Sequence, residues 1–204
     1  PWSRGETSPL LLEQRNSALL VVRRLLKAFS LRSTLLAGLL ALLLSLNIGL
    51  LSACTSPLLI QDLGWTQESY SFWTGNISFA GLLGAIVGGF AADRWGPRKI
   101  AAIGGLGVGA SLCAFALLSS QWANGSFVIA YMAVESFCAG TLSVACFSMF
   151  MTLSWPLVAG TQFTAYMATS NLSRLLGTML VPEIVPESPT TEQWSEVWLI
   201  AAGL

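Results

Sequence analysis

Long apolar segments alternate with short polar segments along most of this chain. Five of the apolar segments are long enough to form helices that cross a bilayer, which takes about 20 residues. They lie at residues 33–60, 70–92, 100–119, 127–153 and 161–181. A sixth begins near Glu196 and continues to the last residue, Leu204. The pattern predicts an all-α polytopic transmembrane helix bundle of about six helices.

The residues before the first apolar segment have a different character. Leucines and valines at 10–29 are mixed with Arg15, Arg23, Arg24 and Lys27, which is typical of a basic amphipathic helix lying on a membrane surface. We therefore predict two parts, a basic amphipathic segment at residues 1–30 and a six-helix transmembrane bundle at residues 31–204. Because the chain begins with proline and its last apolar segment is short, we expect a fragment with a truncated last helix.

Composition and charge placement support a membrane protein and predict its orientation. Charged residues make up 10% of the chain, whereas soluble domains carry about 25%. Six Lys and Arg precede the first apolar segment and three lie at 93–99, while the polar segments at 61–69, 121–126 and 182–195 have none. The positive-inside rule then predicts that residues 1–30 and 93–99 are cytoplasmic.

The same composition excludes several kinds of chemistry. The formal net charge is zero, so no basic field would attract nucleic acid, and the chain contains no histidine. Its four cysteines lie in apolar segments without the CxxC spacing of a zinc site. We therefore expect no metal, no cofactor and no nucleic-acid partner. Without histidine, HExxH or GxSxG, and with one deeply placed carboxylate, a membrane-embedded enzyme is also not expected.

Small residues predict where helices approach closely. Gly84 and Gly88 form one GxxxG pair, and Gly105 and Gly109 form a second. Such pairs let helix backbones meet in lipid. The tryptophans outside the spans, Trp122 and Trp194 among them, are interpreted as interfacial residues.

The most specific motif is GGFAADRWGPRK at residues 88–99, between the second and third apolar segments. It resembles the G-x-x-x-D-R-x-G-R-R/K signature of the major facilitator superfamily, with Pro97 where a basic residue is usual. The matching residues are Gly89, Asp93, Arg94, Gly96, Arg98 and Lys99. Asp93 would lie at a helix C-terminus, where the macrodipole disfavours an anion, so a basic partner or another helix N-terminus is expected. The alternatives are a conformational switch and a turn whose charges only set topology.

Three further stretches, at 56–71, 134–155 and 161–177, resemble the C-terminal half of the muropeptide permease and acetyl-CoA transporter-like branch of that superfamily. The resemblance implies helices 7–12 of a twelve-helix protein, with an N-terminal six-helix half as the missing partner and the bilayer of a bacterial inner membrane as its setting. It also implies a small-molecule substrate, such as a muropeptide-like amino sugar.

Two charges fall deep inside the predicted spans, and each invites a functional hypothesis. Glu135 and Arg174 both lie about eight residues from the outer ends of their segments, a depth of about 12 Å. We predict that they lie near one another or share a ligand, with Glu135 as a proton site. The alternative is a static ion pair that orients two helices.

Amides and hydroxyls extend this predicted substrate and proton pathway. The segment 161–181 is unusually polar, and two further asparagines fall within other spans. The candidates are Gln162, Thr169, Asn171, Asn47 and Asn76. For each one, a helix-to-helix hydrogen bond is the structural alternative. The whole pattern predicts a proton-coupled secondary-active solute transporter. A non-transporting receptor or scaffold on the same fold is the alternative, and its centre would be sealed and apolar.

Overall fold

The computed structural model describes residues 23, 27–156, 158–186 and 188–204. Six α-helices occupy the chain from Arg32 onward. They are α3 (Arg32–Pro57), α4 (Gln67–Trp95), α5 (Pro97–Leu117), α6 (Gly125–Leu153), α7 (Ala159–Ile184) and α8 (Thr191–Gly203). A π-helical turn, η2 (Leu58–Asp62), extends α3, and a 3-10 turn, η3 (Ser119–Gln121), precedes α6. The predicted all-α fold is confirmed, whereas most of the amphipathic segment predicted at 1–30 lies outside the described residues.

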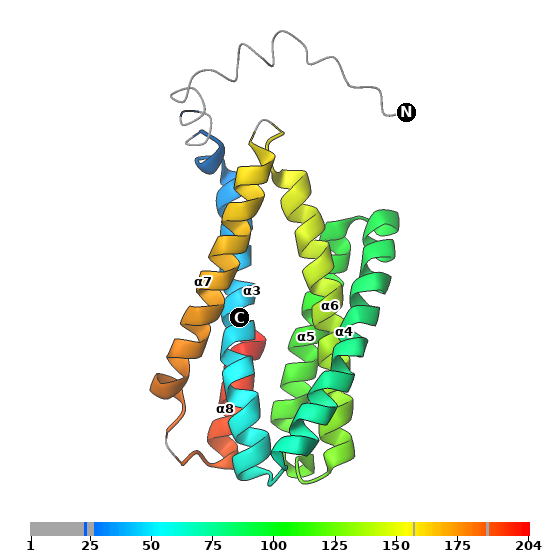
Figure 1. Cartoon of the computed structure of the whole chain (residues 1–204), viewed down its shortest axis with the longest axis vertical. Coiled ribbons are helices and arrows are strands. Elements are labelled where there is room, and N and C mark those ends of the chain that lie inside the picture. Colours follow the sequence, from blue (N-terminus) through cyan, green and yellow to red (C-terminus); the bar gives the residue numbers. More distant parts are fainter. Residues whose placement is uncertain (1–22, 24–26, 157, 187) are drawn as a thin grey trace.

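The helices form two groups that run along the long axis of the molecule (Figure 1). In one group α3 packs along α7, although more than 100 residues separate their first positions. In the other group α4 and α5 both pack against α6. The last helix, α8, packs against α5 and also touches α3, so it connects the two groups.

Four helical stretches among the described residues are long and apolar enough to cross a membrane. They are Arg32–Asp62, Gln67–Trp95, Pro97–Leu117 and Gly125–Leu153. The fifth predicted span is present as α7, with 26 residues, but its polar side chains keep it out of this set. Helix α8 has 13 residues and is about 20 Å long, which is shorter than the roughly 30 Å hydrocarbon core.

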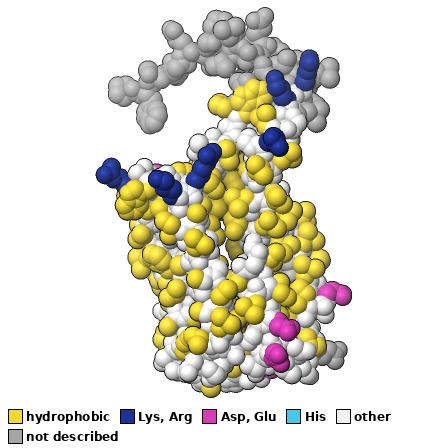
Figure 2. All heavy atoms as spheres, turned by 180° about the vertical axis from the view of Figure 1, so that it is seen from behind, with side chains coloured by type: hydrophobic (Ala, Val, Ile, Leu, Met, Phe, Trp, Pro, Cys, Tyr) yellow, Lys and Arg dark blue, Asp and Glu magenta, His cyan; other side chains and the backbone are white. Residues whose placement is uncertain are grey.

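The outer surface of the bundle suits lipid. Large apolar side chains point outward, among them Phe90 with 75% of its surface exposed and Leu106 with 76%. Figure 2 shows Lys and Arg gathered at one end, with most of the visible Asp and Glu toward the other. A water-soluble protein rarely exposes so much contiguous apolar surface. The chain is therefore an integral membrane protein.

Glycines bring the backbone of α4 into direct contact with α6. A Cβ atom on Gly84 would lie 2.0 Å from the carbonyl oxygen of Phe137, and one on Gly88 would lie 2.8 Å from Cα of Thr141. The Thr141 hydroxyl also donates a hydrogen bond to the Gly84 carbonyl at 3.0 Å. The predicted close contact at Gly84 and Gly88 is confirmed.

The second predicted glycine pair, Gly105 and Gly109, is not the pair that makes the close contact, so that prediction is wrong. A Cβ atom on Gly104 would lie 2.9 Å from the Leu142 nitrogen, and one on Gly107 would lie 2.7 Å from Cys138 Sγ, so these two glycines make the close contacts between α5 and α6. Atoms added at Gly105 and Gly109 would meet their nearest neighbours at 4.0 and 3.6 Å, which is ordinary van der Waals contact. In a run as rich in glycine as GGLGVG, the sequence does not identify the glycine that faces the neighbouring helix.

Aromatic side chains fill the bundle interior near the α5–α6 connection. Phe115 stacks on Trp122 at 4.8 Å and on Tyr131 at 4.0 Å between ring centroids. Trp122 and Trp194 are only 3% and 2% exposed, so these side chains pack inside the bundle and do not face lipid. Burial is tolerated because both indole N–H groups have acceptors, and that of Trp122 donates to the Phe115 carbonyl at 2.8 Å.

Replacing Gly84 with alanine should separate α4 from α6, because the added methyl group would overlap the Phe137 carbonyl. Overpacking of this kind costs about 1–3 kcal/mol. Thermal unfolding in detergent should show a lower midpoint for Gly84→Ala. Gly75→Ala in the same helix is the matched control, since nothing lies within 4 Å of its added Cβ. Equal midpoints for the two variants would contradict the packing described above.

Candidate functional site

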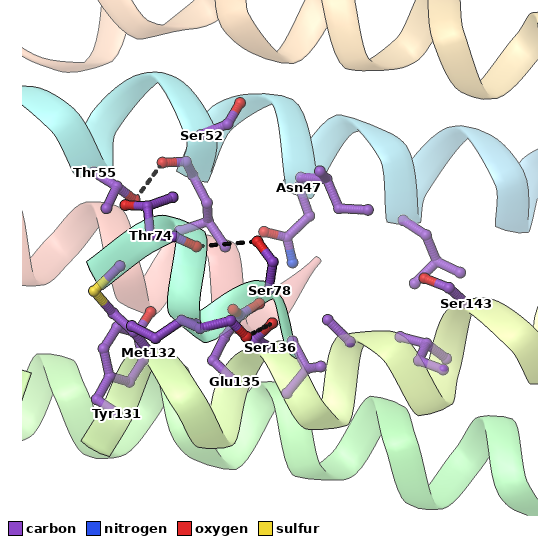
Figure 3. A pocket seen from close by; sticks show the side chains of 17 residues that line it. Asn47, Ser52, Thr55, Thr74, Ser78, Tyr131, Met132, Glu135, Ser136 and Ser143 are labelled. Atoms are coloured by element: carbon purple, nitrogen blue, oxygen red, sulfur yellow. Dashed lines mark hydrogen bonds between the residues drawn. The ribbon is translucent and has the colours of Figure 1, made fainter. Parts of the chain in front are cut away.

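A cavity of about 360 Å³ lies between α3, α4 and α6. Apolar side chains form much of its wall, including Leu44, Ile48 and Leu51 of α3 and Met132 and Leu142 of α6. Its polar lining, labelled in Figure 3 with Met132, consists of Asn47, Ser52, Thr55, Thr74, Ser78, Tyr131, Glu135, Ser136 and Ser143. An apolar pocket with a few convergent polar groups is the usual form of a small-molecule site.

Glu135 is the acidic residue of this cavity. It lies on α6 one helical turn after Tyr131, so both side chains are on one face of the helix. Figure 3 shows Glu135 beside Ser136 at the centre of the site. Among the described residues, neither Lys nor Arg lines the cavity. The carboxylate therefore has no cationic partner there, and an unpaired carboxylate within a membrane span invites a functional role.

Arg174 forms no ion pair with Glu135 among the described residues, and the prediction that the two charges lie near one another or share a ligand gains no support from the structure. Arg174 is exposed on α7 and does not line the cavity, and within the described part of the chain no ion pair joins it to Glu135. Its backbone carbonyl instead faces Gly49 of α3, where an added Cβ would lie 2.1 Å away. The direction in which the Arg174 side chain leaves its helix depends on which face of α7 packs on α3, and the sequence does not give that direction.

Asn47 holds α3 to α8 and also faces the cavity. Its side-chain nitrogen donates a hydrogen bond to the Ala201 carbonyl at 2.8 Å. That bond fixes the orientation of the amide, because the side-chain oxygen in the same place would face the Ala201 carbonyl, and both groups are acceptors. The side chain is 9% exposed, and Oδ1 has no hydrogen-bond partner. A buried amide oxygen without a donor is uncommon in folded proteins.

Gln162 joins helices and does not line the cavity. It is fully buried, its Oε1 accepts a hydrogen bond from the Trp155 N–H at 2.6 Å, and its Nε2 donates to Thr34 Oγ1 at 3.0 Å. These two bonds fasten the α6–α7 connection to the start of α3. The geometry favours the structural alternative for this residue.

The remaining amides and hydroxyls predicted for the pathway lie elsewhere. Thr169 lines a second hollow of about 250 Å³ between α3 and α7, with Tyr166, whose buried hydroxyl has no hydrogen-bond partner. Asn171 is exposed on α7. Asn76 is exposed on α4, and its side-chain nitrogen donates to the Phe72 carbonyl of its own helix at 2.8 Å. The structure therefore does not bring these three residues to the cavity.

The GGFAADRWGPRK segment forms a tight turn between α4 and α5. Gly96 ends one helix and begins the next with φ of 91°, a conformation that strongly favours glycine. Pro97 is the first residue of α5, where its fixed φ suits a helix start. This position explains why proline is accommodated where the motif usually has a basic residue.

The charged residues of this turn point away from the bundle. Asp93, Arg94, Arg98 and Lys99 are all exposed. Asp93 forms no ion pair within the described residues, so the basic partner or helix N-terminus expected for it stays a prediction. Gly89 makes ordinary contact with Val144, 3.6 Å from an added Cβ, and the close approach is at Gly88 instead.

Several cavity residues were not predicted from the sequence. Tyr131 lies four residues before Glu135, and this spacing could have placed both on one helix face. Ser136, Ser52 and Thr55 gave no signal, because isolated hydroxyls in apolar helices commonly bond to their own backbone.

Comparison with known proteins identifies a family. The family model described as the Major Facilitator Superfamily matches residues 35–204, which include all of the cavity. No curated protein and no solved structure matches the chain.

Replacing Gln162 with leucine should destabilise the protein, because the part-buried backbone N–H of Trp155 and the buried Thr34 hydroxyl would lose their partner. An unsatisfied buried group costs about 1–3 kcal/mol. The midpoint of thermal unfolding in detergent should fall, while Thr161→Leu, at the exposed neighbouring position, should leave it nearly unchanged. A stable Gln162→Leu protein with altered transport would argue for a role in the solute pathway instead.

Proposed function

Because the chain belongs to the major facilitator superfamily, whose members are membrane solute transporters, we propose that it forms half of a proton-coupled secondary-active transporter. Its solute binds in the cavity between α3, α4 and α6, and Glu135 carries the coupling proton. The observation that supports this proposal is an acidic side chain in an otherwise mainly apolar cavity, within a bundle whose outer surface suits lipid.

Proton coupling follows from the cost of enclosing a charge. A carboxylate in a closed, low-dielectric cavity is strongly destabilised unless it is neutralised or paired. Glu135 is the acidic residue that lines the cavity, and among the described residues the helices around it bring no Lys or Arg to its wall. Protonation of Glu135, or arrival of a compensating solute, therefore permits closure. This replaces a mechanism in which protonation releases Arg174.

Exposed polar residues of α4 and α7 support a partner half. Arg174 and Asn171 are exposed on α7, and Asn76 is exposed on α4. An arginine side chain that faces lipid within a membrane span is costly, so we expect protein or water to surround Arg174. We place a second six-helix bundle against these faces, and rocking of the two bundles about the cavity then gives alternating access.

The charge distribution supports the proposed orientation. Lys99 and its basic neighbours face the cytoplasm together with the residues before α3, and the acidic connections face outward. The resemblance to the muropeptide permease branch favours a bacterial inner membrane and an amino-sugar substrate. A receptor or scaffold is the alternative function, but it would not require a cavity with a carboxylate.

Glu135→Gln should abolish coupling while preserving the shape of the cavity. In proteoliposomes containing the full-length protein, a proton gradient should no longer drive solute accumulation, whereas solute should still equilibrate down its own gradient. A pH-sensitive dye and labelled solute measure the two fluxes. Glu192→Gln, at an exposed position in the first turn of α8, is the control and should remain coupled. Unchanged coupling in Glu135→Gln would remove the proton role.

Topology can be tested without knowing the solute. A cysteine at Arg98 should react with a membrane-impermeant maleimide only in inside-out vesicles, and a cysteine at Ser188 only in right-side-out vesicles. The native cysteines lie within α3, α5 and α6 and give the background in the unsubstituted protein. Labelling of both positions from the same side would contradict the proposed topology.

A further inference from the structure

The hydrogen-bonding state of the cavity wall identifies the kind of solute that fits it. A hydroxyl group has one proton to donate and two lone pairs to accept with. Ser52 and Thr55 of α3 donate their protons to the Gly49 and Leu51 carbonyls, at 2.9 and 2.7 Å. These two side chains therefore offer only acceptor oxygen to the cavity.

The same is true on the other two helices. Ser78 of α4 donates to the Thr74 carbonyl at 3.0 Å, and Ser136 of α6 donates to the Ile77 carbonyl at 3.3 Å. Four of the hydroxyls around the cavity have thus already used their protons on the backbone. Among the described lining residues, only the hydroxyls of Thr74, Tyr131 and Ser143 keep an uncommitted proton.

Two stronger hydrogen-bond acceptors in the same wall receive no hydrogen bond from the protein donors that the structure describes. Asn47 has used its nitrogen on the Ala201 carbonyl, and its buried Oδ1 has no partner. The Glu135 carboxylate accepts no hydrogen bond from the described residues and has no cation beside it in the cavity. Figure 3 shows Asn47, Ser78, Ser136 and Glu135 arriving from three helices around one space.

We propose that this cavity binds an amphiphilic primary amine in its protonated form, with the ammonium group between Glu135 and Asn47. An ammonium group brings three donors and one positive charge, which matches a carboxylate and an orphan amide oxygen. The apolar part of the solute lies against Leu44, Ile48 and Met132. The inference rests on the proposed function and names its substrate class; an amino sugar with a free amine shares the polar group.

The opposite charge does not fit this wall. A carboxylate or phosphate needs donors, and the cavity offers no Lys or Arg among its described residues while it already holds Glu135. Two anions in one poorly hydrated site would repel one another. A quaternary ammonium satisfies the charge but has no N–H group for Asn47.

The test uses the full-length protein in phosphatidylcholine nanodiscs and four probes that share a phenyl group on a two-carbon chain: phenethylammonium, its trimethyl analogue, phenethyl alcohol and phenylacetate. Isothermal titration should rank the primary ammonium first, with the trimethyl analogue and the alcohol weaker by about tenfold and phenylacetate weaker still. Equal or tighter binding of phenylacetate, or equal binding of the trimethyl analogue, overturns the proposal.

Substitutions of Glu135 and Asn47 test whether these two acceptors bind the ammonium group. Glu135→Gln should weaken the binding of phenethylammonium by about tenfold or more, while the affinity for phenethyl alcohol should stay unchanged. Asn47→Leu should weaken the binding of the primary ammonium more than the binding of its trimethyl analogue. Asn76→Leu is the matched control, since this asparagine is exposed and lies outside the cavity wall. If Asn47→Leu does not fold, the probe series and Glu135→Gln decide the question without it.

Failure of this inference is distinguishable from failure of the proposed function. Proton-driven accumulation of a neutral or anionic solute, without binding of phenethylammonium, would overturn the substrate class and leave the transporter intact. Absence of proton-coupled flux for any solute, together with binding of phenethylammonium, would overturn the transport proposal and leave the ligand site intact.

Discussion

Polar groups within the hydrocarbon layer must find partners inside the protein, because no water is present there to provide them. Most of this structure satisfies that constraint locally. Hydroxyls donate to carbonyls of their own or a neighbouring helix, as Thr141 does to Gly84 across the α4–α6 contact. Gln162 uses both ends of its amide, and buried tryptophans direct their N–H groups to acceptors such as the Tyr131 hydroxyl. The helices are held in register by these bonds as well as by packing.

The few groups that escape this constraint mark the places where something else is expected to bind. Asn47 Oδ1 and the Tyr166 hydroxyl are the buried polar atoms without partners among the described residues. Each of these two residues lines a hollow, and the larger hollow also contains Glu135. A helix bundle built only for stability would have filled these positions with apolar side chains. Their presence fits the solute site proposed above.

The sequence predicts the helices well and the directions of their side chains poorly. The apolar segment at 161–181 anticipates α7 to within a few residues, because span length and polar boundaries are one-dimensional properties. Depth along a helix axis is equally accessible, but the angle around the axis is set by the neighbouring helix. That angle separates Arg174 from Glu135, buries Gln162 between helices, and moves the close contact from Gly105 to Gly104. The cavity is formed by residues of three helices, so no local sequence pattern predicts it.

The glycine contacts have a mechanical consequence. Where backbones touch without intervening side chains, as at Gly84 against Phe137 and at Gly177 against the Leu46 carbonyl, neighbouring helices behave as one stiff body. The α4–α6 pair and the α3–α7 pair are two such bodies, and they meet each other only lightly. The cavity lies between these two pairs, where they make few contacts. A change in its width therefore calls for movement between the two pairs and not within either of them.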